Sequence, residues 1–400
     1  MMDRIKRYYQ YVICLCKLFV AFVYVQVCKK RLYSKNIWLI QEKHTEARDN
    51  GYHLFRYLRN EHPELNVYFS ITHDSADHNK VDQYGNVIDA DSIKHYIYYL
   101  AAKQSIGSQA YGACPYPTYW VNQFRFLCRK DQKNIFLQHG IITNKLPTLA
   151  RDKIGCDLFV CSSERELNYV QKELGYNNNS AQLLGLCRYD NLVRSNAPLK
   201  QILIMPTFRK NIAPKDTEKH ATDAEIETFK NSLYYQSYTA LLSNKRLLSK
   251  AQEYNYRIVF YLHYAFQAYT KLFKSVSSDI IIADRYDYDV QQLLLESSIL
   301  ITDYSSIYFD FAYMKKPEMF FQFDEHEFRE NHYAQGYFDY RADGFGPVFT
   351  QVDEIADHII HCIETGCEME EKYKQRVDAF FAYHDDRNCE RNYNAIKRLN

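Results

Sequence analysis

The sequence has almost no excess charge of either sign, with 50 Lys and Arg side chains against 49 Asp and Glu side chains. A protein that binds nucleic acid over a broad surface needs a strongly basic balance or a basic patch. The formal net charge of +1 therefore gives no general electrostatic support for a nucleic-acid partner, and we expect none.

Paired cysteine motifs are also missing. The 11 cysteines include no Cys-x-x-Cys, and no Cys/His group has the spacing of zinc ligands. The closest pairs are Cys14/Cys16, Cys156/Cys161 and Cys362/Cys367. An odd number of cysteines scattered over a long chain favours free thiols in a reducing compartment over a disulfide framework.

The N-terminal segment lacks the small-residue cleavage site of a removable signal peptide. Residues 8–28 are mostly apolar, lie between MMDRIKR and KKR, and are about long enough to span a bilayer. Polar or amphipathic residues recur every seven positions in this region: Asp3, Gln10, Lys17, Tyr24 and Arg31. This stripe favours a helix in the plane of the membrane interface, with its basic flanks on anionic headgroups. A spanning helix and a helix packed on the protein's own core remain the alternatives.

The whole chain has the composition of a globular protein, with 46% hydrophobic and 25% charged residues, and 400 residues suggest at least two domains. Apolar runs alternate with helical patterns in two series that meet near residues 195–200. The alternation predicts an α/β protein of two doubly wound, Rossmann-like domains with parallel sheets, which bind ligands in a cleft at the carboxyl ends of their strands. We expect an N-terminal helix (1–30), two domains (31–195 and 196–370) and C-terminal helices (371–400) that cross back to the first domain.

One strand ends in ILITDYSS, residues 299–306, directly before a helical pattern. After Asp303 and Tyr304, the hydroxyls of Ser305 and Ser306 stand at the expected helix start. Helix N-termini carry unpaired N–H groups and a partial positive charge, so this turn could hold a phosphate or diphosphate. The alternative is that Ser305 is simply the N-cap of the helix.

Three further strand ends carry polar side chains. Thr207 and Arg209 follow one strand, His263 follows another, and His139 ends a strand of the first half. Each alone is consistent with a surface or structural residue. Their common position at carboxyl ends predicts a base on one wall of a cleft, with cations and hydroxyl donors on the other.

Several segments resemble the CDP-glycerol glycerophosphotransferases, the teichoic-acid polymerase and primase family. LQHGIITNK is similar to the family's His-Gly segment, LLGLCRYDNL to its Gly-x-x-Arg-x-Asp segment, and ILIMPTFRK to its Pro-Thr-(Trp/Phe)-Arg strand. The segment LLLESSILITDYSSIYFDFAYMKKP resembles the family's Leu-Ile-Thr-Asp-Tyr-Ser-Ser segment, and GYFDYRADGFGPVF resembles the stretch after it. The resemblance runs in order from about residue 31 to residue 350.

The resemblance implies a GT-B fold and a peripheral enzyme at the cytoplasmic face of the cell membrane. It implies that a CDP-polyol, usually CDP-glycerol, donates a polyol phosphate to a hydroxyl of a glycan or lipid-linked acceptor of the cell wall or capsule, and that CMP leaves. It implies no cofactor.

Carried onto this sequence, the resemblance gives His139 the role of catalytic base, with Gly140 beside it. A histidine suits this role near neutral pH. His263 is the second catalytic residue, which holds the diphosphate and the charge that builds on the departing CMP.

The remaining site residues implied by the resemblance surround the donor. Thr207, Arg209, Ser305 and Ser306 bind its diphosphate, and Asp303 orients the turn. Asp289 caps the next helix or supports the loop near the ribose. The acidic cluster Asp284, Asp287 and Asp289 is more typical of solvated or capping carboxylates than of a metal site, so we expect no essential metal.

The sequence departs from the family pattern at two places. Gln138 stands where a Trp is usual, with Ile141–Ile142 where a Pro follows, and Tyr264 stands where a Pro is common. These changes leave the polyol and the acceptor open. A GT-B glycosyltransferase that uses a nucleotide sugar and an inactive membrane adaptor with the same fold are the alternative functions.

Overall fold

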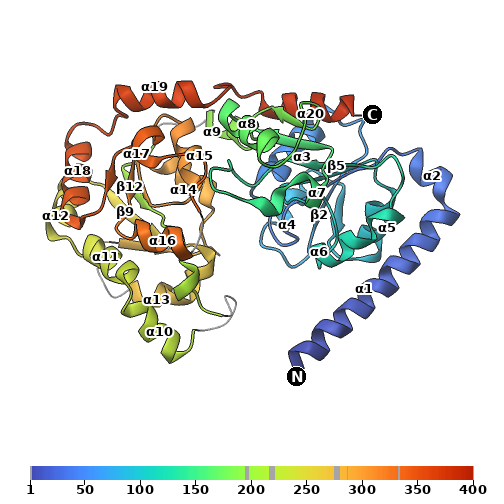
Figure 1. The fold of residues 1–400 in the computed structure, drawn as a ribbon, viewed down its shortest axis with the longest axis horizontal. Coiled ribbons are helices and arrows are strands. Elements are labelled where there is room, and N and C mark those ends of the chain that lie inside the picture. The colour runs from blue at the N-terminus through green and yellow to red at the C-terminus, as the bar shows by residue number, and fades with distance from the viewer. Residues whose placement is uncertain are drawn as a thin grey trace. The chain divides into compact units, whose positions relative to one another are not determined.

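The computed structural model describes residues 2–193, 198–215, 221–273, 280–285, 287–331 and 334–399 (Figure 1). The chain forms two compact units. The first comprises Met1–Ile141, Leu146–Asp190 and Asp385–Asn400, and the second comprises Ile142–Lys145 and Asn191–His384. Residues 195–197 of the predicted domain boundary and 216–220 of a predicted loop lie outside the described residues.

The first unit is built on a parallel sheet whose described strands follow the order β3-β2-β1-β4-β5-β6-β7. The strands are β1 (Trp38–Gln41), β2 (Val67–Ile71), β3 (Val87–Asp89), β4 (Gln104–Gly107), β5 (Lys133–Phe136), β6 (Leu158–Cys161) and β7 (Ala181–Leu183). Strands β1, β4 and β6 are buried along their whole length. Near-continuous burial is expected of parallel strands that helices cover on both faces.

The helices of this part of the chain are α1 (Met2–Val27), α2 (Lys29–Tyr33), α3 (Asn50–Glu61), α4 (His78–Asp82), α5 (Ile93–Ala101), α6 (Thr118–Val121), α7 (Arg151–Ile154), α8 (Glu164–Lys172), α9 (Tyr189–Val193) and α20 (Asn388–Arg398). Several of them begin at polar caps, among them α3, α5 and α8. Ser92 caps α5 by accepting a hydrogen bond from the backbone of His95, and Ser163 caps α8 in the same way. Asp49 caps α3, which packs against β1, β2 and β4.

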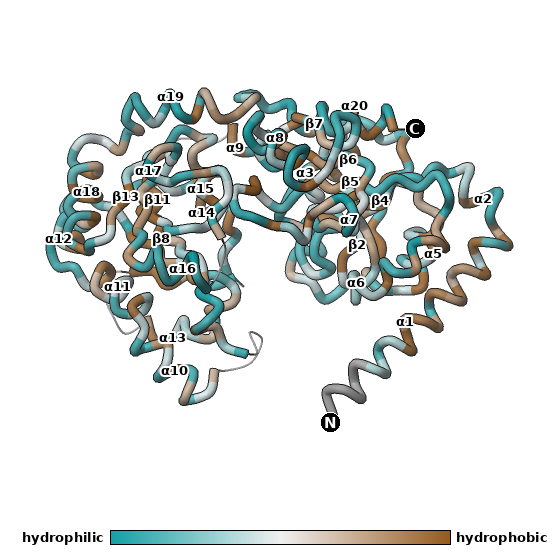
Figure 2. The backbone as a smooth tube through the Cα atoms, in the orientation of Figure 1, coloured by the Kyte–Doolittle hydropathy of each residue, from teal (hydrophilic) through white to brown (hydrophobic). Residues whose placement is uncertain are grey.

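Helix α1 packs one of its faces against α5. Leu18, Ala21 and Val25 are buried in the same core as residues of α5. Lys17 Nζ donates a hydrogen bond to the carbonyl oxygen of Asp91 at 2.7 Å, so this member of the predicted polar stripe contacts protein. The other face is apolar and exposed, and Figure 2 shows hydrophobic colour along much of the helix.

The second unit contains a parallel sheet whose described strands follow the order β10-β9-β8-β11-β12-β13. The strands are β8 (Gln201–Ile204), β9 (Arg257–Tyr261), β10 (Ile280–Ala283), β11 (Ile299–Thr302), β12 (Glu318–Phe321) and β13 (Val348–Phe349). From the sequence alone, the apolar run 317–324 reads as the last strand of this sheet. That prediction is wrong, because β13 adds a two-residue edge strand beside β12.

The helices of the second unit are α10 (Asp223–Lys230), α11 (Leu233–Leu242), α12 (Lys245–Glu253), α13 (Thr270–Phe273), α14 (Val290–Glu296), α15 (Ile307–Tyr313), α16 (Glu325–Asn331), α17 (Tyr340–Asp343), α18 (Val352–Glu364) and α19 (Glu371–Phe380). From its apolar pattern, the segment 228–255 reads as one or two helices, but it contains the end of α10 and all of α11 and α12. Helix α10 begins at Asp223, inside the polar stretch 211–225 that reads as a loop. Ser232 and Asn244 each accept a backbone N–H three residues ahead, which starts a new helix at each position.

Both sheets have the strand order of a doubly wound fold, in which the direction of winding reverses between two central strands. The reversal lies between β1 and β4 in the first unit and between β8 and β11 in the second. Open α/β sheets bind ligands beside this point, at the carboxyl ends of the strands. The predicted site residues follow strands at or next to these positions.

Helix α20 belongs to the first unit although it lies near the end of the sequence. Its first backbone N–H groups, of Asn388 and Cys389, donate to the carboxylate of Asp190 at 2.7 and 2.8 Å. The helix packs on α3. A carboxylate at a helix N-terminus satisfies unpaired donors and favours the helix dipole.

Candidate active site

His139 stands on a tight turn after β5. Leu137 and Gln138 continue the chain from the strand, and Gln138 has a φ of 66°. Gln138 is buried, and its side chain donates hydrogen bonds to the Val160 carbonyl and to Glu166 inside the unit. The side chain of His139 is 68% exposed. The turn therefore presents the imidazole of His139 to solvent, while Gln138 anchors the backbone inside the unit. Gln138 departs from the family's usual Trp at this position, and the interior accommodates this change.

A buried carboxylate orients this imidazole. Oδ2 of Asp49 lies 2.6 Å from Nδ1 of His139. Because a carboxylate only accepts, Nδ1 carries the proton, and Nε2 of the neutral ring has the lone pair. Burial opposes ionisation of Asp49, but the charges of His139 and Arg188 outweigh it and hold the pKa of Asp49 below its usual value. The pair has the geometry of a general base with its positioning residue.

Arg188 and Asn50 fix this pair to the rest of the unit. Arg188 Nη1 donates to Asp49 Oδ1 at 2.7 Å and to the His139 carbonyl at 2.8 Å. Asn50 Nδ2 donates to the Gln138 carbonyl, and Asn50 Oδ1 accepts the Arg188 backbone N–H. Three segments far apart in the sequence therefore meet around one histidine.

Glu42, which follows β1, holds the start of α3 beneath Asp49. Its carboxyl oxygens accept the backbone N–H groups of Arg48, Asp49 and Tyr52 at 2.7, 2.9 and 2.6 Å. Burial and the nearby charge of Asp49 raise the pKa of Glu42, against the effect of these three donors. The contacts fix the position of the Asp49 backbone, so Glu42 supports the base indirectly.

In the second unit, the turns after β8 and β11 are joined by Asp303. This buried carboxylate accepts the backbone N–H groups of Thr207 and Tyr304 at 2.8 and 2.6 Å. Asp303 thus has the turn-orienting contacts that the sequence suggested. Within the described part of the chain, Oγ1 of Thr207 is buried and has no hydrogen-bond partner. A buried hydroxyl of this kind needs a partner, which can be an ordered water, an ion or a ligand.

Arg209 makes its contacts inside the protein. Its guanidinium forms ion pairs with Asp303 at 2.9 Å and with Asp324 at 2.7 Å, and donates to the Thr207 carbonyl. The side chain is 4% exposed. Two carboxylates around one cation do not favour a further anion, so this geometry favours a role in positioning the turns. The predicted contact of Arg209 with a diphosphate stays a prediction.

His263 follows β9 and stacks on the Phe208 ring, with centroids 4.7 Å apart. Its Nδ1 accepts the backbone N–H of Ala265 at 3.2 Å. The proton of the neutral ring is therefore on Nε2, which makes this nitrogen a donor. His263 is half-buried beside the turn that contains Thr207, a position suited to an anionic group.

The two serines lie directly before α15. Ser306 is exposed and Ser305 is half-buried. The N-cap of α15 is Ser306 and not Ser305, and its side chain makes no capping hydrogen bond. Gly140 is half-buried beside His139, and Asp289 caps α14 by accepting the Gln292 backbone N–H. Among the described residues, no group of three or more His, Cys, Asp or Glu is placed to hold a metal ion.

The segment that follows His139 changes unit. Residues 142–145 belong to the second unit, where Asn144 forms an antiparallel bridge with Gln335. Asn144 Oδ1 also accepts a hydrogen bond from Arg329 at 3.1 Å. The histidine therefore stands on the stretch of chain that runs from one sheet into the other unit.

Sequence reasoning did not identify Asp49, Arg188, Glu42 or Asp324 as site residues. Asp49 and His139 are 90 positions apart, and Arg209 and Asp324 are 115 positions apart. The available signals were local ones: Asp49 stands before a helix that begins Asn-Gly, and Arg188 lies in the Gly-x-x-Arg-x-Asp segment.

Comparison with known proteins identifies the family. The sequence model of the CDP-Glycerol:Poly(glycerophosphate) glycerophosphotransferase family matches residues 21–398. The chain belongs to this family. Its relatives include the minor teichoic acid biosynthesis protein GgaB of Bacillus subtilis (strain 168), 36% identical over 91% of this chain. The chain spans 40% of the length of GgaB. A teichoic acid poly(glycerol phosphate) polymerase of the same organism is 25% identical over 58% of this chain and 28% of its own length.

Solved structures bear out the predicted fold. The wall teichoic acid polymerase TagF superposes with a TM-score of 0.68 over 100% of this chain and 98% of the solved chain, at 16% identity. Staphylococcus aureus MnaA, solved with UDP, matches with a TM-score of 0.54 over 90% of this chain and 96% of the solved chain, at 11% identity. The chain thus has the GT-B class of fold, with two Rossmann-like units.

Proposed function

We propose that this protein transfers a polyol phosphate, most simply glycerol phosphate, from a CDP-polyol to a hydroxyl of a glycan or lipid-linked acceptor of the cell wall or capsule. The observation that carries the proposal is the exposed imidazole of His139, held through Nδ1 by the buried carboxylate of Asp49. Membership of the glycerophosphotransferase family supports the same chemistry.

In the proposed reaction, Nε2 of His139 accepts the proton of the acceptor hydroxyl as its oxygen attacks the β-phosphorus of the donor. A new oxygen–phosphorus bond forms, the bond from that phosphorus to the bridging oxygen breaks, and CMP leaves with the bonding electrons. General-base help of this kind is typically worth ~10²–10⁴ in rate.

We propose that the second unit binds the donor. The hydroxyls of Thr207, Ser305 and Ser306 and the Nε2–H of His263 donate to the diphosphate, and they offset the charge that builds on CMP. Support comes from the partnerless Thr207 hydroxyl and from the fixed tautomer of His263. Arg209 and Asp303 then hold the two turns at the geometry these donors need.

Release of CMP tests this function. The purified chain is incubated with an acceptor and, separately, CDP-glycerol, CDP-ribitol and UDP-sugars. CMP release with a CDP-polyol is the expected result, and UDP release would favour the glycosyltransferase alternative. His139→Ala should reduce CMP release by ~10²–10⁴-fold, while His326→Ala, which alters an exposed histidine of α16, should leave it unchanged. Equal rates for wild type and His139→Ala would favour the inactive adaptor.

We also propose that the protein is peripheral at the cytoplasmic face of the membrane and that the outer face of α1 contacts lipid. Residues 8–27 form a helix long and apolar enough to cross a bilayer by length and composition. The packing of Leu18 and the contact of Lys17 with Asp91 support a helix that keeps one face on the protein. A helix in the membrane interface keeps its inner face on the protein and its outer face in lipid, whereas a helix with lipid on all sides would lose the protein contacts.

A further inference from the structure

Helix α18 ends in a turn that brings two cysteines together. Gly366 has a φ of +94°, and the backbone N–H of Cys367 donates to the Cys362 carbonyl at 2.9 Å. This bond from the residue after the left-handed glycine back to the last turn is that of a Schellman motif. The two residues that it joins commonly make an apolar side-chain contact. Here both of them are cysteines, and neither forms a disulfide.

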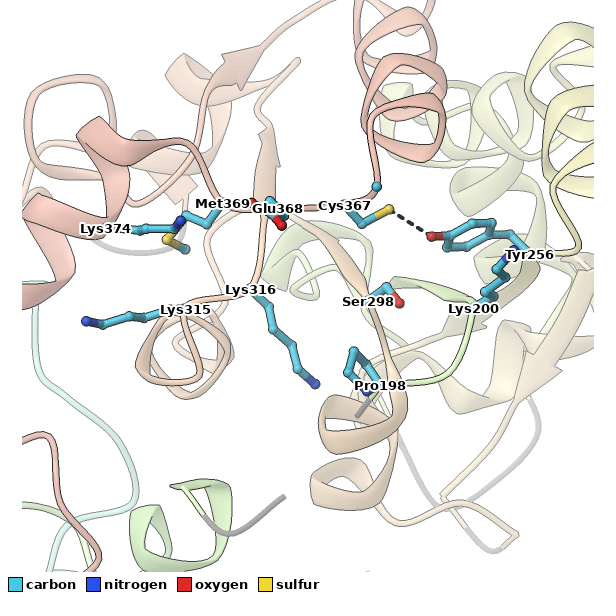
Figure 3. Close-up of a pocket in the computed structure, with 11 residues that line it drawn as sticks. Pro198, Lys200, Tyr256, Ser298, Lys315, Lys316, Cys367, Glu368, Met369 and Lys374 are labelled. Atoms are coloured by element: carbon cyan, nitrogen blue, oxygen red, sulfur yellow. Dashed lines mark hydrogen bonds between the residues drawn. The ribbon is translucent and has the colours of Figure 1, made fainter. Parts of the chain in front are cut away.

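The thiol of Cys367 also borders a pocket of ≈ 370 Å³ in the second unit (Figure 3). Its Sγ lies 3.0 Å from the hydroxyl of Tyr256, which stands at the start of β9. Ser298 and Glu368 line the same pocket. Cys362 is buried, whereas Cys367 is partly exposed, so a small reagent in the pocket meets Cys367 first.

The surroundings of this thiol are rich in positive charge. The pocket is lined by four lysines, Lys200, Lys315, Lys316 and Lys374, against the single described carboxylate of Glu368. The ammonium of Lys200 lies 5.8 Å from the centroid of the Tyr256 ring. Lys315 and Lys316 are engaged elsewhere, with Asp378 and with the carbonyls of Leu294 and Leu295. Lys200 donates to the Tyr254 carbonyl at 3.1 Å, and its charge also lowers the pKa of the Cys367 thiol.

The two thiols differ in acidity. Hydrogen bonding from Cys362 lowers the pKa of Cys367, Tyr256 and the charge of Lys200 lower it further, and burial opposes them. The same interaction with Cys367, together with burial, raises the pKa of Cys362. Attack by a cysteine needs the thiolate, and a neighbouring thiol can then resolve the product. The geometry therefore makes Cys367 the attacking sulfur and Cys362 the resolving one.

We propose that Cys367 and Cys362 form a peroxide-reactive pair that closes to a reversible disulfide at the end of α18. The Cys367 thiolate attacks one oxygen of hydrogen peroxide, the oxygen–oxygen bond breaks, and the leaving hydroxide takes a proton to become water. The sulfur of Cys362 then attacks the resulting sulfenic acid, a sulfur–sulfur bond forms, and a second water leaves. Two thiols are oxidised and one peroxide is reduced to two waters.

Backbone geometry favours closure over other fates of the sulfenic acid. A disulfide needs Cα atoms roughly 4.4–6.8 Å apart, a separation that a direct backbone hydrogen bond between the two residues brings within reach. The chain also provides internal controls. Cys16 is exposed and Cys28 is partly exposed, and they belong to α1 or follow it directly. If access alone decided reactivity, Cys16 would be oxidised first.

The test is peptide mapping of the full-length protein after a limiting dose of hydrogen peroxide at neutral pH. We expect the Cys362–Cys367 cross-link to form at least ~10-fold faster than any oxidation of Cys16 or Cys28, and a dithiol reductant to reverse it. In a parallel reaction, a limiting alkylating reagent should label Cys367 before Cys16. This ranking uses the wild-type chain, so it does not depend on how any variant folds.

Variants then assign the steps. Cys362→Ser should stop at a sulfenic acid on Cys367, which a dimedone-type probe captures, and Cys367→Ser should remove the rapid reaction. Lys200→Met and Tyr256→Phe should each slow alkylation of Cys367 and leave Cys16 unaffected. Earlier labelling of Cys16 or Cys28, or a Cys367 that reacts no faster than in the urea-unfolded chain, would overturn the proposal.

Discussion

Among the described residues, the imidazole of His139 is held through Nδ1 alone, which leaves Nε2 for the reaction. Asp49 fixes Nδ1, and Arg188 in turn neutralises Asp49. The motif LQHG was sufficient to predict that His139 belongs to the site, because a strand end and a turn are features of the local sequence. Its partner could not be predicted in the same way, because nothing local links a helix cap to a residue 90 positions later.

Asp49→Asn tests the positioning role. The amide keeps the size of the side chain, but it can present its NH₂ to Nδ1 and so stabilise the tautomer that has no lone pair on Nε2. We expect kcat to fall by ~10²–10⁴-fold with little change in the KM for the donor. The measurement is CMP release against donor concentration, with the exposed Asp74→Asn as the matched control. A change in donor KM alone would contradict the assignment.

Arg209 provides a second residue-scale test, because its two possible roles predict different outcomes. If it holds the turns, Arg209→Met leaves Asp303 and Asp324 buried without their cation, and the free energy of unfolding of the second unit should fall by ~3–5 kcal/mol. If it binds the diphosphate, Arg209→Lys should raise the donor KM without loss of stability. We expect the first outcome, read from urea denaturation and donor binding together.

At the scale of elements, α1 shows how far periodicity carries a prediction. The apolar run correctly predicted a long helix, but the seven-residue polar stripe did not reveal that Lys17 contacts Asp91. A long lysine side chain can bond a carbonyl while its stem packs on apolar groups, so charge alone does not tell which face meets water. Packing against α5 decides which face of α1 is buried, and the sequence of α1 alone does not contain this information.

The two faces of α1 should separate membrane binding from stability. Phe19 and Val23 are 68% and 45% exposed. Changing both to Ser should therefore weaken binding to anionic phospholipid vesicles by at least ~10²-fold, because burying each side chain contributes ~1.5–3 kcal/mol. The free energy of unfolding should change little. Leu18→Ala on the inner face should do the reverse and cost ~2–5 kcal/mol of stability. Co-sedimentation with vesicles and urea denaturation measure the two effects, and equal vesicle binding by all three proteins would refute the lipid contact.

At the scale of the whole molecule, the two-sheet architecture was predictable because buried parallel strands are continuous apolar runs, such as Trp38–Gln41 and Ile299–Thr302. The strands that sequence reasoning missed are the short edge strands β3, β7 and β13. Two or three residues with partly exposed side chains give no distinctive pattern. Their pairing depends on the neighbouring strand being already in place.

Two buried histidines should make the first unit sensitive to acid. Burial lowers the pKa of His53 to about 3 and that of His95 to about 4. Between these values and the unfolded value near 6.5, the unfolded chain binds more protons, so stability rises with pH and is lost as pH falls. Each histidine should contribute a loss of ~2 kcal/mol between pH 6.5 and pH 5.

A single variant isolates one of these contributions. His53 has a buried Nδ1 without a hydrogen-bond partner in the described chain, so His53→Leu should be tolerated at pH 7. The variant should lose ~2 kcal/mol less than the wild type over the same pH interval. Both tryptophans, Trp38 and Trp120, lie in the first unit, so their fluorescence reports its unfolding in urea. An unchanged pH dependence would mean that His53 is not buried in its neutral form.

The contact between Asp190 and α20 has a consequence for biosynthesis. The cap and the first residue of the helix are 198 positions apart, and nearly all of the second unit is encoded between them. A ribosome therefore completes the second unit before it delivers the helix that covers α3. Until α20 is made, the surface of α3 in the nascent first unit stays uncovered and accessible to chaperones. The first unit can therefore complete its folding only after residues 388–398 have been translated.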